Sequence, residues 1–240
     1  MLRCAIVIPA RMASTRFPGK PLCDLLGKPM IQWVVEAAIA SGVAERVVVA
    51  TPDQEIVDAC SAFGAEAVPT RLDHPSGTDR IVEVSAAIEA DLYVNVQGDE
   101  PLIRPEGIRM LADPMLADKE GMVGTVYTDC AVEEVDNPAV VKLTKSEQGN
   151  ALYFSRCPIP YPRSQRQHCY KHIGLYAYRK PALAAFSRRG PTELELTEGL
   201  EQLRFLELGI SIRVFPGQPS AMAVDTPEQA EEVRRILSAR

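Results

Sequence analysis

Apolar, β-branched runs alternate with helical patterns through the first half of the chain, and this alternation restricts the fold more than any other feature. Strands are expected at 4–8, 46–50, 91–96 and 122–127, and helices at 30–39, 55–63, 80–88 and 106–111. Such alternation predicts β-α-β units, and the nearly continuous apolar character of the strands indicates burial on both faces. The sequence therefore predicts a Rossmann-like α/β fold with a mainly parallel sheet flanked by helices.

The second half of the chain has a different rhythm. Short strands are expected at 140–144, 151–155, 173–178 and 210–215, and helices at 181–186, 194–208 and 227–237. Polar and proline-rich links separate the first three strands, which favours antiparallel pairing. We expect one domain over residues 1–240, in which roughly residues 129–190 form a smaller antiparallel insertion.

Charge and cysteine usage exclude several classes of protein. A net charge of -6 argues against a nucleic-acid partner, because such proteins neutralise many phosphates with clustered cations. The six cysteines form no CxxC pair, so neither a zinc site nor a disulfide framework is expected. The first apolar stretch, 4–8, is too short for a signal sequence or a membrane span. We expect a cytoplasmic protein that does not bind membranes.

The loop after the first strand concentrates positive charge. Arg11, Arg16 and Lys20 lie within thirteen residues, together with the hydroxyl of Ser14. Open α/β sheets bind ligands at the carboxyl ends of their strands, and paired guanidinium donors suit phosphate oxygens. The loop matches neither the Walker pattern nor GxGxxG. It predicts a triphosphate site, and the alternative is a solvated surface loop.

The loop also carries a family signature. Its letters follow the pattern PAR-x-x-S-x-R-x-PGKPL, which resembles the N-terminal motif of the 3-deoxy-D-manno-octulosonate (Kdo) cytidylyltransferases. The resemblance implies nucleotide contacts from six residues of this segment: Pro9, Ala10, Arg11, Ser14, Arg16 and Lys20.

A carboxylate follows the strand at 91–96. Asp99 lies at the same edge of the predicted sheet as the first loop, and Mg²⁺ prefers one or two carboxylates together with substrate phosphate oxygens. Glu100 is expected to point to the other face. A simple Gly-Asp turn is the alternative. The segment resembles the family motif N-x-QGDEP, which implies a metal ligand at Asp99 and contacts from Gln97 to both nucleotide and sugar.

A second carboxylate, Asp225, precedes the last helix. Asp225 with Glu228 forms an N-cap pattern, but Thr226 with Gln229 is an equally good capping pair that would leave Asp225 free. The residues alone leave both possibilities open. Resemblance to the family motif GVDTP implies a second metal ligand at Asp225, although Ala223 stands here in place of the glycine.

The segment 70–80 opens a predicted helix, whose N-terminus offers donors to an anion or a base. Ser76 and its neighbours could instead merely cap that helix. The segment resembles the family's TR-x-DH-x-SGTDR, which implies nucleotide contacts from Arg71, Ser76 and Gly77.

Three motifs of the second half point to a sugar site by resemblance. They are HxGxYxY with His172 and Tyr176, E-x-LEQLR with Glu201 and Gln202, and ALYFSR with Arg156 as partner for a sugar carboxylate. Strand alternation places His172, Gly174, Tyr176 and Tyr178 on one face. Without the resemblance, His172 would be a structural histidine, and Glu201 with Arg204 an ordinary surface pair.

The resemblance covers residues 5 to about 235 and implies a reaction. The anomeric hydroxyl of Kdo would attack the α-phosphorus of CTP, giving CMP-Kdo for lipopolysaccharide or capsule synthesis and pyrophosphate. Arg11, Arg16, Lys20 and Asp99 would carry the catalysis, with Mg²⁺ as cofactor and a homodimer as the assembly.

Three other functions are compatible with the sequence. The acceptor could be a related acidic compound such as 8-amino-Kdo, a sialic-type sugar or a phosphonate. A glycosyltransferase would usually show an Asp-x-Asp metal pair, but Gln97 stands two residues before Asp99. A non-catalytic nucleotide sensor would bind CTP without releasing pyrophosphate.

Overall fold

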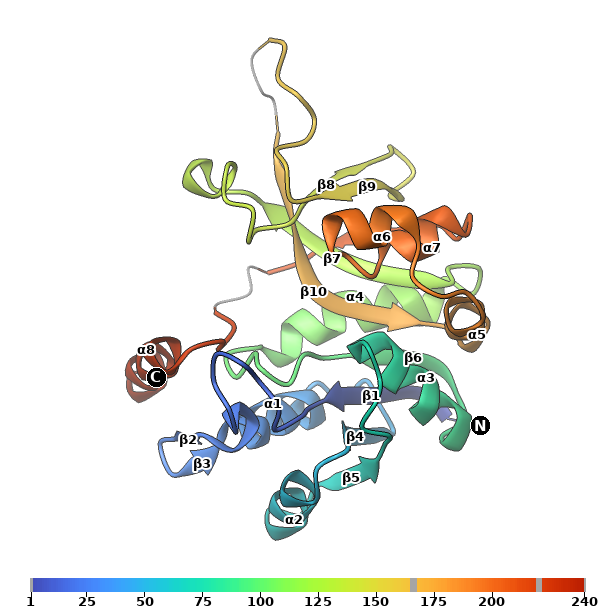
Figure 1. Ribbon diagram of the computed structural model, residues 1–240. Helices are drawn as coiled ribbons and strands as arrows, with labels where there is room; N and C mark the ends of the chain where they lie inside the picture. Colours follow the sequence, from blue (N-terminus) through green and yellow to red (C-terminus); the bar gives the residue numbers. More distant parts are fainter. Residues whose placement is uncertain (1, 165–167, 219–221, 240) are drawn as a thin grey trace.

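The computed structural model describes residues 2–164, 168–218 and 222–239, and its centre is a single mixed sheet. Seven strands follow one another in the order β11-β7-β10-β6-β1-β4-β5 (Figure 1). In chain order they are β1 (Leu2–Pro9), β4 (Arg46–Thr51), β5 (Glu66–Pro69), β6 (Ala90–Asn95), β7 (Val123–Asp129), β10 (Tyr170–Tyr178) and β11 (Ile212–Pro216). The hairpin of β8 (Lys142–Lys145) and β9 (Ala151–Ser155) joins the sheet through β10, and β2 (Asp24–Leu25) pairs separately with β3 (Lys28–Pro29).

The sheet is parallel wherever β-α-β units build it. β1 pairs in parallel with both β4 and β6, β4 with β5, and β7 with β11. β10 is the exception, because it is antiparallel to both of its neighbours, β6 and β7. The prediction of a mainly parallel sheet with antiparallel strands in the second half is confirmed, and β10 lies inside the main sheet.

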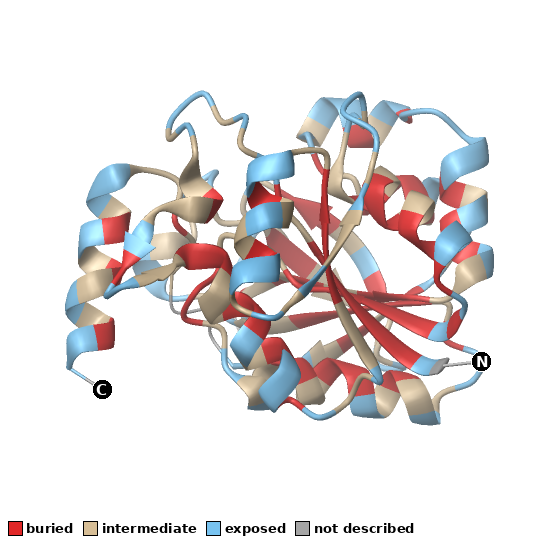
Figure 2. Ribbon diagram, turned by 90° about the horizontal axis from the view of Figure 1, so that it is seen from below, coloured by how far each residue is buried: buried red, intermediate tan, exposed pale blue. Residues whose placement is uncertain are grey.

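Helices cover both faces of the sheet, as predicted. They are α1 (Met30–Ala40), α2 (Gln54–Ala62), α3 (Gly77–Ala87), α4 (Pro105–Ala117), α5 (Lys180–Arg188), α6 (Glu193–Glu198), α7 (Leu203–Glu207) and α8 (Pro227–Ser238), with short 3₁₀ turns at Lys20–Leu22 and Val132–Glu134. Along β1, Cys4, Ile6 and Ile8 pack in the core under α1 and α4, whereas Ala5 and Val7 pack in the core under α3 and α5. The buried centre of the sheet is visible in Figure 2.

The single helix predicted over 194–208 is wrong. α6 ends at Glu198 because Gly199 adopts φ +63°, a left-handed conformation that favours glycine and stops the helix. α7 begins only at Leu203, so Glu201 and Gln202 lie in the turn between two short helices.

Across the described parts of the chain, no helix combines the length and the apolar character needed to cross a bilayer.

Candidate active site

The basic loop after β1 forms one wall of a cleft of about 790 Å³. The backbone N–H of Met12 donates to Asp53 Oδ2 at 2.7 Å, and that of Gly19 donates to the Met12 carbonyl at 3.0 Å. Gly19 has φ +72°, which allows the chain to turn back toward the sheet. All six predicted nucleotide contacts of this segment line the cleft: Pro9, Ala10, Arg11, Ser14, Arg16 and Lys20.

Two further loops complete the cleft. Ser76 and Gly77 reach it from the start of α3, and Gln97 and Asp99 from the carboxyl end of β6. Ser76 is also the N-cap of α3, since its Oγ accepts a hydrogen bond from Asp79 N at 3.1 Å. Ser76 therefore both caps α3 and lines the cleft. Glu201 is the member of the predicted sugar set that joins Gln97 in the cleft.

Two carboxylates converge on one cation in the cleft. Lys20 Nζ lies 2.7 Å from Asp99 Oδ2 and 3.1 Å from Asp225 Oδ1, and an Arg16 nitrogen lies 3.0 Å from Asp225 Oδ2. Thr226 and Gln229 make the capping box of α8, so the Asp225 carboxylate is not used as a helix cap and pairs with Arg16 and Lys20 instead. Two convergent carboxylates beside an open cleft are a donor set that fits a hard divalent cation completed by phosphate and water oxygens.

The cleft contains two ionisable residues that the sequence analysis did not assign to the site. Arg80 is buried, and its guanidinium donates to the carbonyl of Arg71 at 3.0 Å and to the Thr70 hydroxyl. Burial, with a smaller effect of the nearby Arg11 charge, lowers the pKa of Arg80. His74 also lines the cleft, and its Nε2 bonds the Glu83 carboxylate. The helical period offered a signal for Arg80, because it lies four residues after Ser76 and so on the same side of α3.

Five predicted site residues do not line the cleft. Arg71 is exposed and pairs with Asp73 at 3.0 Å. Arg156 donates to three carbonyl oxygens, those of Pro138, Glu198 and Gly199, at 2.7–3.3 Å. The other three come from β10 and the α6–α7 turn: His172, Tyr176 and Gln202. The contacts proposed for these five stay predictions.

His172 and Tyr176 belong to an aromatic group on one face of β10. Their rings lie 5.1 Å apart, and the Tyr178 ring stacks on Tyr176 at 5.7 Å. His172 Nε2 lies 3.0 Å from the Thr125 hydroxyl oxygen. That hydroxyl has one proton, which it donates to the Leu175 carbonyl at 2.8 Å, with the Ile173 carbonyl farther away at 3.3 Å. The Thr125 oxygen therefore accepts from His172, which assigns the proton to Nε2 and leaves Nδ1 as an acceptor.

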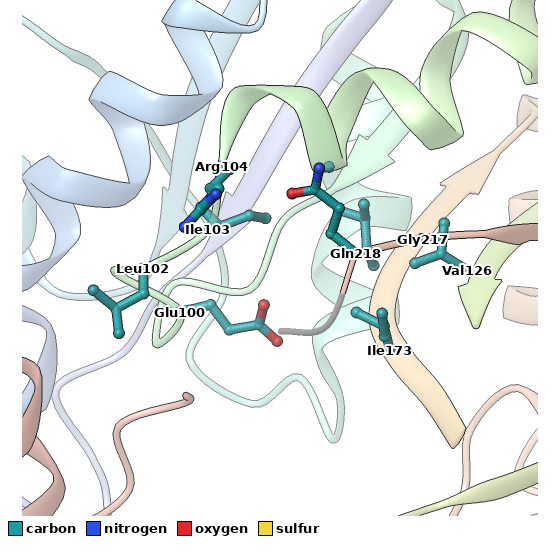
Figure 3. A pocket seen from close by; sticks show the side chains of 10 residues that line it. Glu100, Leu102, Ile103, Arg104, Val126, Ile173, Gly217 and Gln218 are labelled. Carbon is teal, nitrogen blue, oxygen red and sulfur yellow. The ribbon is translucent and has the colours of Figure 1, made fainter. Parts of the chain in front are cut away.

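Glu100 points away from the cleft, as predicted. It lines a separate cavity of about 440 Å³ between α4 and β10, shared with Arg104 and Gln218 and floored by Val126 and Ile173 (Figure 3). The neighbouring carboxylates of Asp99 and Glu100 thus line two different cavities.

A mainly parallel sheet whose carboxyl edge gathers three cations and two carboxylates in one cleft is typical of a nucleotidyltransferase. The sequence model of the cytidylyltransferase family matches residues 5–212. An Escherichia coli 3-deoxy-manno-octulosonate cytidylyltransferase is 47% identical over 240 residues, which cover 99% of this chain and 97% of the relative. The Geobacter metallireducens enzyme of the same name is 44% identical, with 99% and 98% covered. The chain belongs to the 3-deoxy-manno-octulosonate cytidylyltransferase family.

Solved structures agree with this placement. The structure of CMP:2-keto-3-deoxy-manno-octonic acid synthetase complexed with CTP superposes with a TM-score of 0.96, at 45% identity and 99% coverage of both chains. A 4-diphosphocytidyl-2C-methyl-D-erythritol synthase from Anaerococcus prevotii gives 0.68 at 11% identity, which shows a shared fold alone.

Proposed function

We propose that this chain transfers CMP from CTP to the anomeric hydroxyl of Kdo and releases pyrophosphate. The observation that carries the proposal is that one cleft gathers three cations, Arg11, Arg16 and Lys20, and the two carboxylates Asp99 and Asp225. Relatives of nearly equal length that are named for this activity, and a similar structure complexed with CTP, support the same reaction.

The basic loop would act on the phosphates. Both substrates and the leaving group are anions, so the barrier is largely electrostatic, and preorganised cations reduce it. The Arg11 and Arg16 guanidinium groups can each grip two phosphate oxygens, and the Lys20 ammonium adds a point charge. Ser76, Gly77 and Gln97 would orient the nucleoside so that the α-phosphorus faces the acceptor.

Asp99 and Asp225 would hold Mg²⁺. A bound magnesium ion neutralises phosphate charge and lowers the pKa of a coordinated hydroxyl. Since Lys20 already balances both carboxylates, the ion and the ammonium group compete for the same charge. We assign no protein residue as general base.

Polar groups of the second half would recognise the acceptor. Gln202 Nε2 is buried outside the cleft and has no hydrogen-bond partner among the described residues, so it would donate to a sugar hydroxyl only after the α6–α7 turn shifts. Glu201 and Gln97 face the cleft, and His172 and Tyr176, whose rings lie 5.1 Å apart on β10, would complete the acceptor side. Arg156 would pair with the sugar carboxylate after giving up a backbone carbonyl.

The proposal includes a cytoplasmic homodimer. All six cysteines are free thiols, which suits a reducing compartment. Segment 157–164 projects beyond β8 and β9 (Figure 1) and exposes 85% of Tyr161, and Leu152 on β9 is 61% exposed. Among the described residues, three of the seven large apolar side chains that are exposed lie within 129–190, and they would offer contacts to a second copy: Val132, Leu152 and Tyr161.

Pyrophosphate release tests the function. Each nucleoside triphosphate is supplied with Kdo and Mg²⁺, and then CTP is supplied with 8-amino-Kdo, a sialic acid or a phosphonate. The proposal expects the highest kcat/KM with CTP and Kdo. Faster turnover of another acceptor would replace Kdo as the substrate, and CTP binding without any turnover would indicate a sensor.

A further inference from the structure

A direct hydrogen bond joins the nucleotide side of the cleft to the acceptor side. Thr78 lies in the first turn of α3, immediately after Ser76 and Gly77, and is only 4% exposed. Its Oγ1 donates to Glu201 Oε2 at 2.7 Å, across a sequence separation of 123 residues. Among the described residues this is the side-chain hydrogen bond that connects α3 to the α6–α7 turn.

The hydrogen bond from Thr78 restricts the conformation of the Glu201 side chain. Glu201 lies in a turn between two short helices, so helical packing does not select its rotamer. The hydroxyl of Thr78 holds one carboxylate oxygen, and the described residues supply no hydrogen bond to the other. A carboxylate held at one oxygen presents the second to a ligand in a defined direction.

Thr78 is itself supported from behind. Tyr178 packs in one hydrophobic cluster with Ile81 and Val84 of α3, the helix that carries Thr78. Tyr178 is almost fully buried on β10, the central antiparallel strand. The helix that carries Thr78 is thus packed on β10, while the Thr78 hydroxyl bonds the acceptor turn.

We infer that Thr78 is a positioning residue for the acceptor, which holds the Glu201 carboxylate toward the sugar hydroxyls. The inference rests on the proposed function for the identity of the acceptor.

The test compares Thr78→Val, which keeps the shape and removes the hydroxyl, with Thr78→Ser, which keeps the hydroxyl. We expect Thr78→Val to raise the KM for Kdo about tenfold, as for loss of a hydrogen bond to a charged group, and to leave the KM for CTP within about twofold. Thr78→Ser should stay near wild type. Thr78→Val combined with Glu201→Gln should be no worse than Glu201→Gln alone. Equal changes in both KM values, or an unchanged KM for Kdo, would overturn the inference.

Crystal structures of the wild type and both variants separate this inference from the proposed function. If wild type releases no pyrophosphate with CTP and Kdo, the proposed function fails, but the orientation of Glu201 still reports on Thr78. The inference requires the Glu201 carboxylate to keep its direction in Thr78→Ser and to leave it in Thr78→Val. An unmoved Glu201 in Thr78→Val would show that other contacts position it.

Discussion

The backbone of Gly98 passes so close to that of Pro9 that a Cβ atom on Gly98 would lie 2.7 Å from the Pro9 carbonyl oxygen. This close approach packs the loop that carries Asp99 against the loop that carries Arg11. The negative charge of Asp99 and the positive charge of Arg11 therefore lie in the same cleft. Gly98→Ala should force the two strand ends apart, at a cost of about 1–3 kcal/mol in unfolding free energy, and should reduce kcat/KM for CTP.

Thermal unfolding and steady-state kinetics check the Gly98→Ala prediction. Gly107→Ala is the matched control, because that glycine lies inside α4 with no atom within 4 Å of an added Cβ. The control should be stabilised by roughly 0.5–1 kcal/mol through helix propensity. Equal behaviour of the two variants would show that the contact between Gly98 and Pro9 does not shape the site.

Asp99→Asn should lower turnover at least ~10²-fold, the usual loss for one preorganised electrostatic group. The substitution removes a negative charge that is needed to hold Mg²⁺, while the side chain keeps its size. Pyrophosphate release at saturating substrates measures the effect, and Asp113→Asn on the exposed face of α4 should be neutral. Removal of Mg²⁺ by a chelator should abolish pyrophosphate release by the wild type, and added Mg²⁺ should restore it. Near-normal turnover of Asp99→Asn would remove this residue from the metal site.

Lys20→Met should have opposite effects on metal and nucleotide. Lys20 balances both carboxylates in the free protein, so its removal should tighten binding of Mg²⁺ or Mn²⁺ without nucleotide by up to about fivefold, the upper range for partly exposed ion pairs. The KM for CTP should rise, because one phosphate partner is lost. Titration calorimetry with the metal alone measures the first effect. Unchanged metal affinity would mean that Lys20 and the ion do not compete.

The sequence could predict the first half of the fold because local and tertiary preferences agree there. Each buried strand from β1 to β7 alternates with an amphipathic helix, and this pattern has few solutions. The position of β10 between β6 and β7 could not be predicted, since the partner of a strand depends on packing against distant segments. The break at Gly199 was missed because a glycine within a helical pattern is often tolerated.

The phosphate side of the site could be predicted better than the sugar side. Arg11, Arg16 and Lys20 share one short loop, so their proximity follows from sequence spacing alone. The sugar residues come from separate elements, and their side chains depend on buried contacts such as that of Thr78 with Glu201. Spacing within a motif carries no information about such a contact.

His172 should make stability depend on pH. Burial lowers its pKa from the usual 6.5 to about 3 in the folded chain. Above pH 6.5 the ring is neutral in both states and the full stabilisation is present. Between about 6.5 and 3 only the unfolded chain binds the proton, so the free energy of unfolding falls as the pH falls. Urea denaturation at pH 7.5 and 5.5 should show a smaller pH effect in His172→Gln, and an unchanged slope would contradict the assignment.

Glu195 and Arg204 form a buried ion pair that fixes the turn carrying Glu201. The Arg204 side chain is 3% exposed, donates through two nitrogens to the Glu195 carboxylate and stacks 3.6 Å over the Phe186 ring. The surface pair of Glu201 with Arg204 considered from local spacing is therefore wrong, because the chain turns at Gly199 and carries Arg204 inward. Arg204→Met leaves a buried carboxylate uncompensated and should cost about 3–5 kcal/mol in unfolding free energy.

Urea denaturation of single and double variants checks this pair. Arg204→Met with Glu195→Leu should recover much of the loss, since apolar replacements of a whole buried pair are often tolerated. Glu231→Gln, which breaks the exposed pair with Arg234 on α8, should change stability by less than about 1 kcal/mol. A small effect of Arg204→Met, equal to that of Glu231→Gln, would mean that the pair is solvated and that the α6–α7 turn is held by its apolar contacts with Leu203 and Phe205 instead.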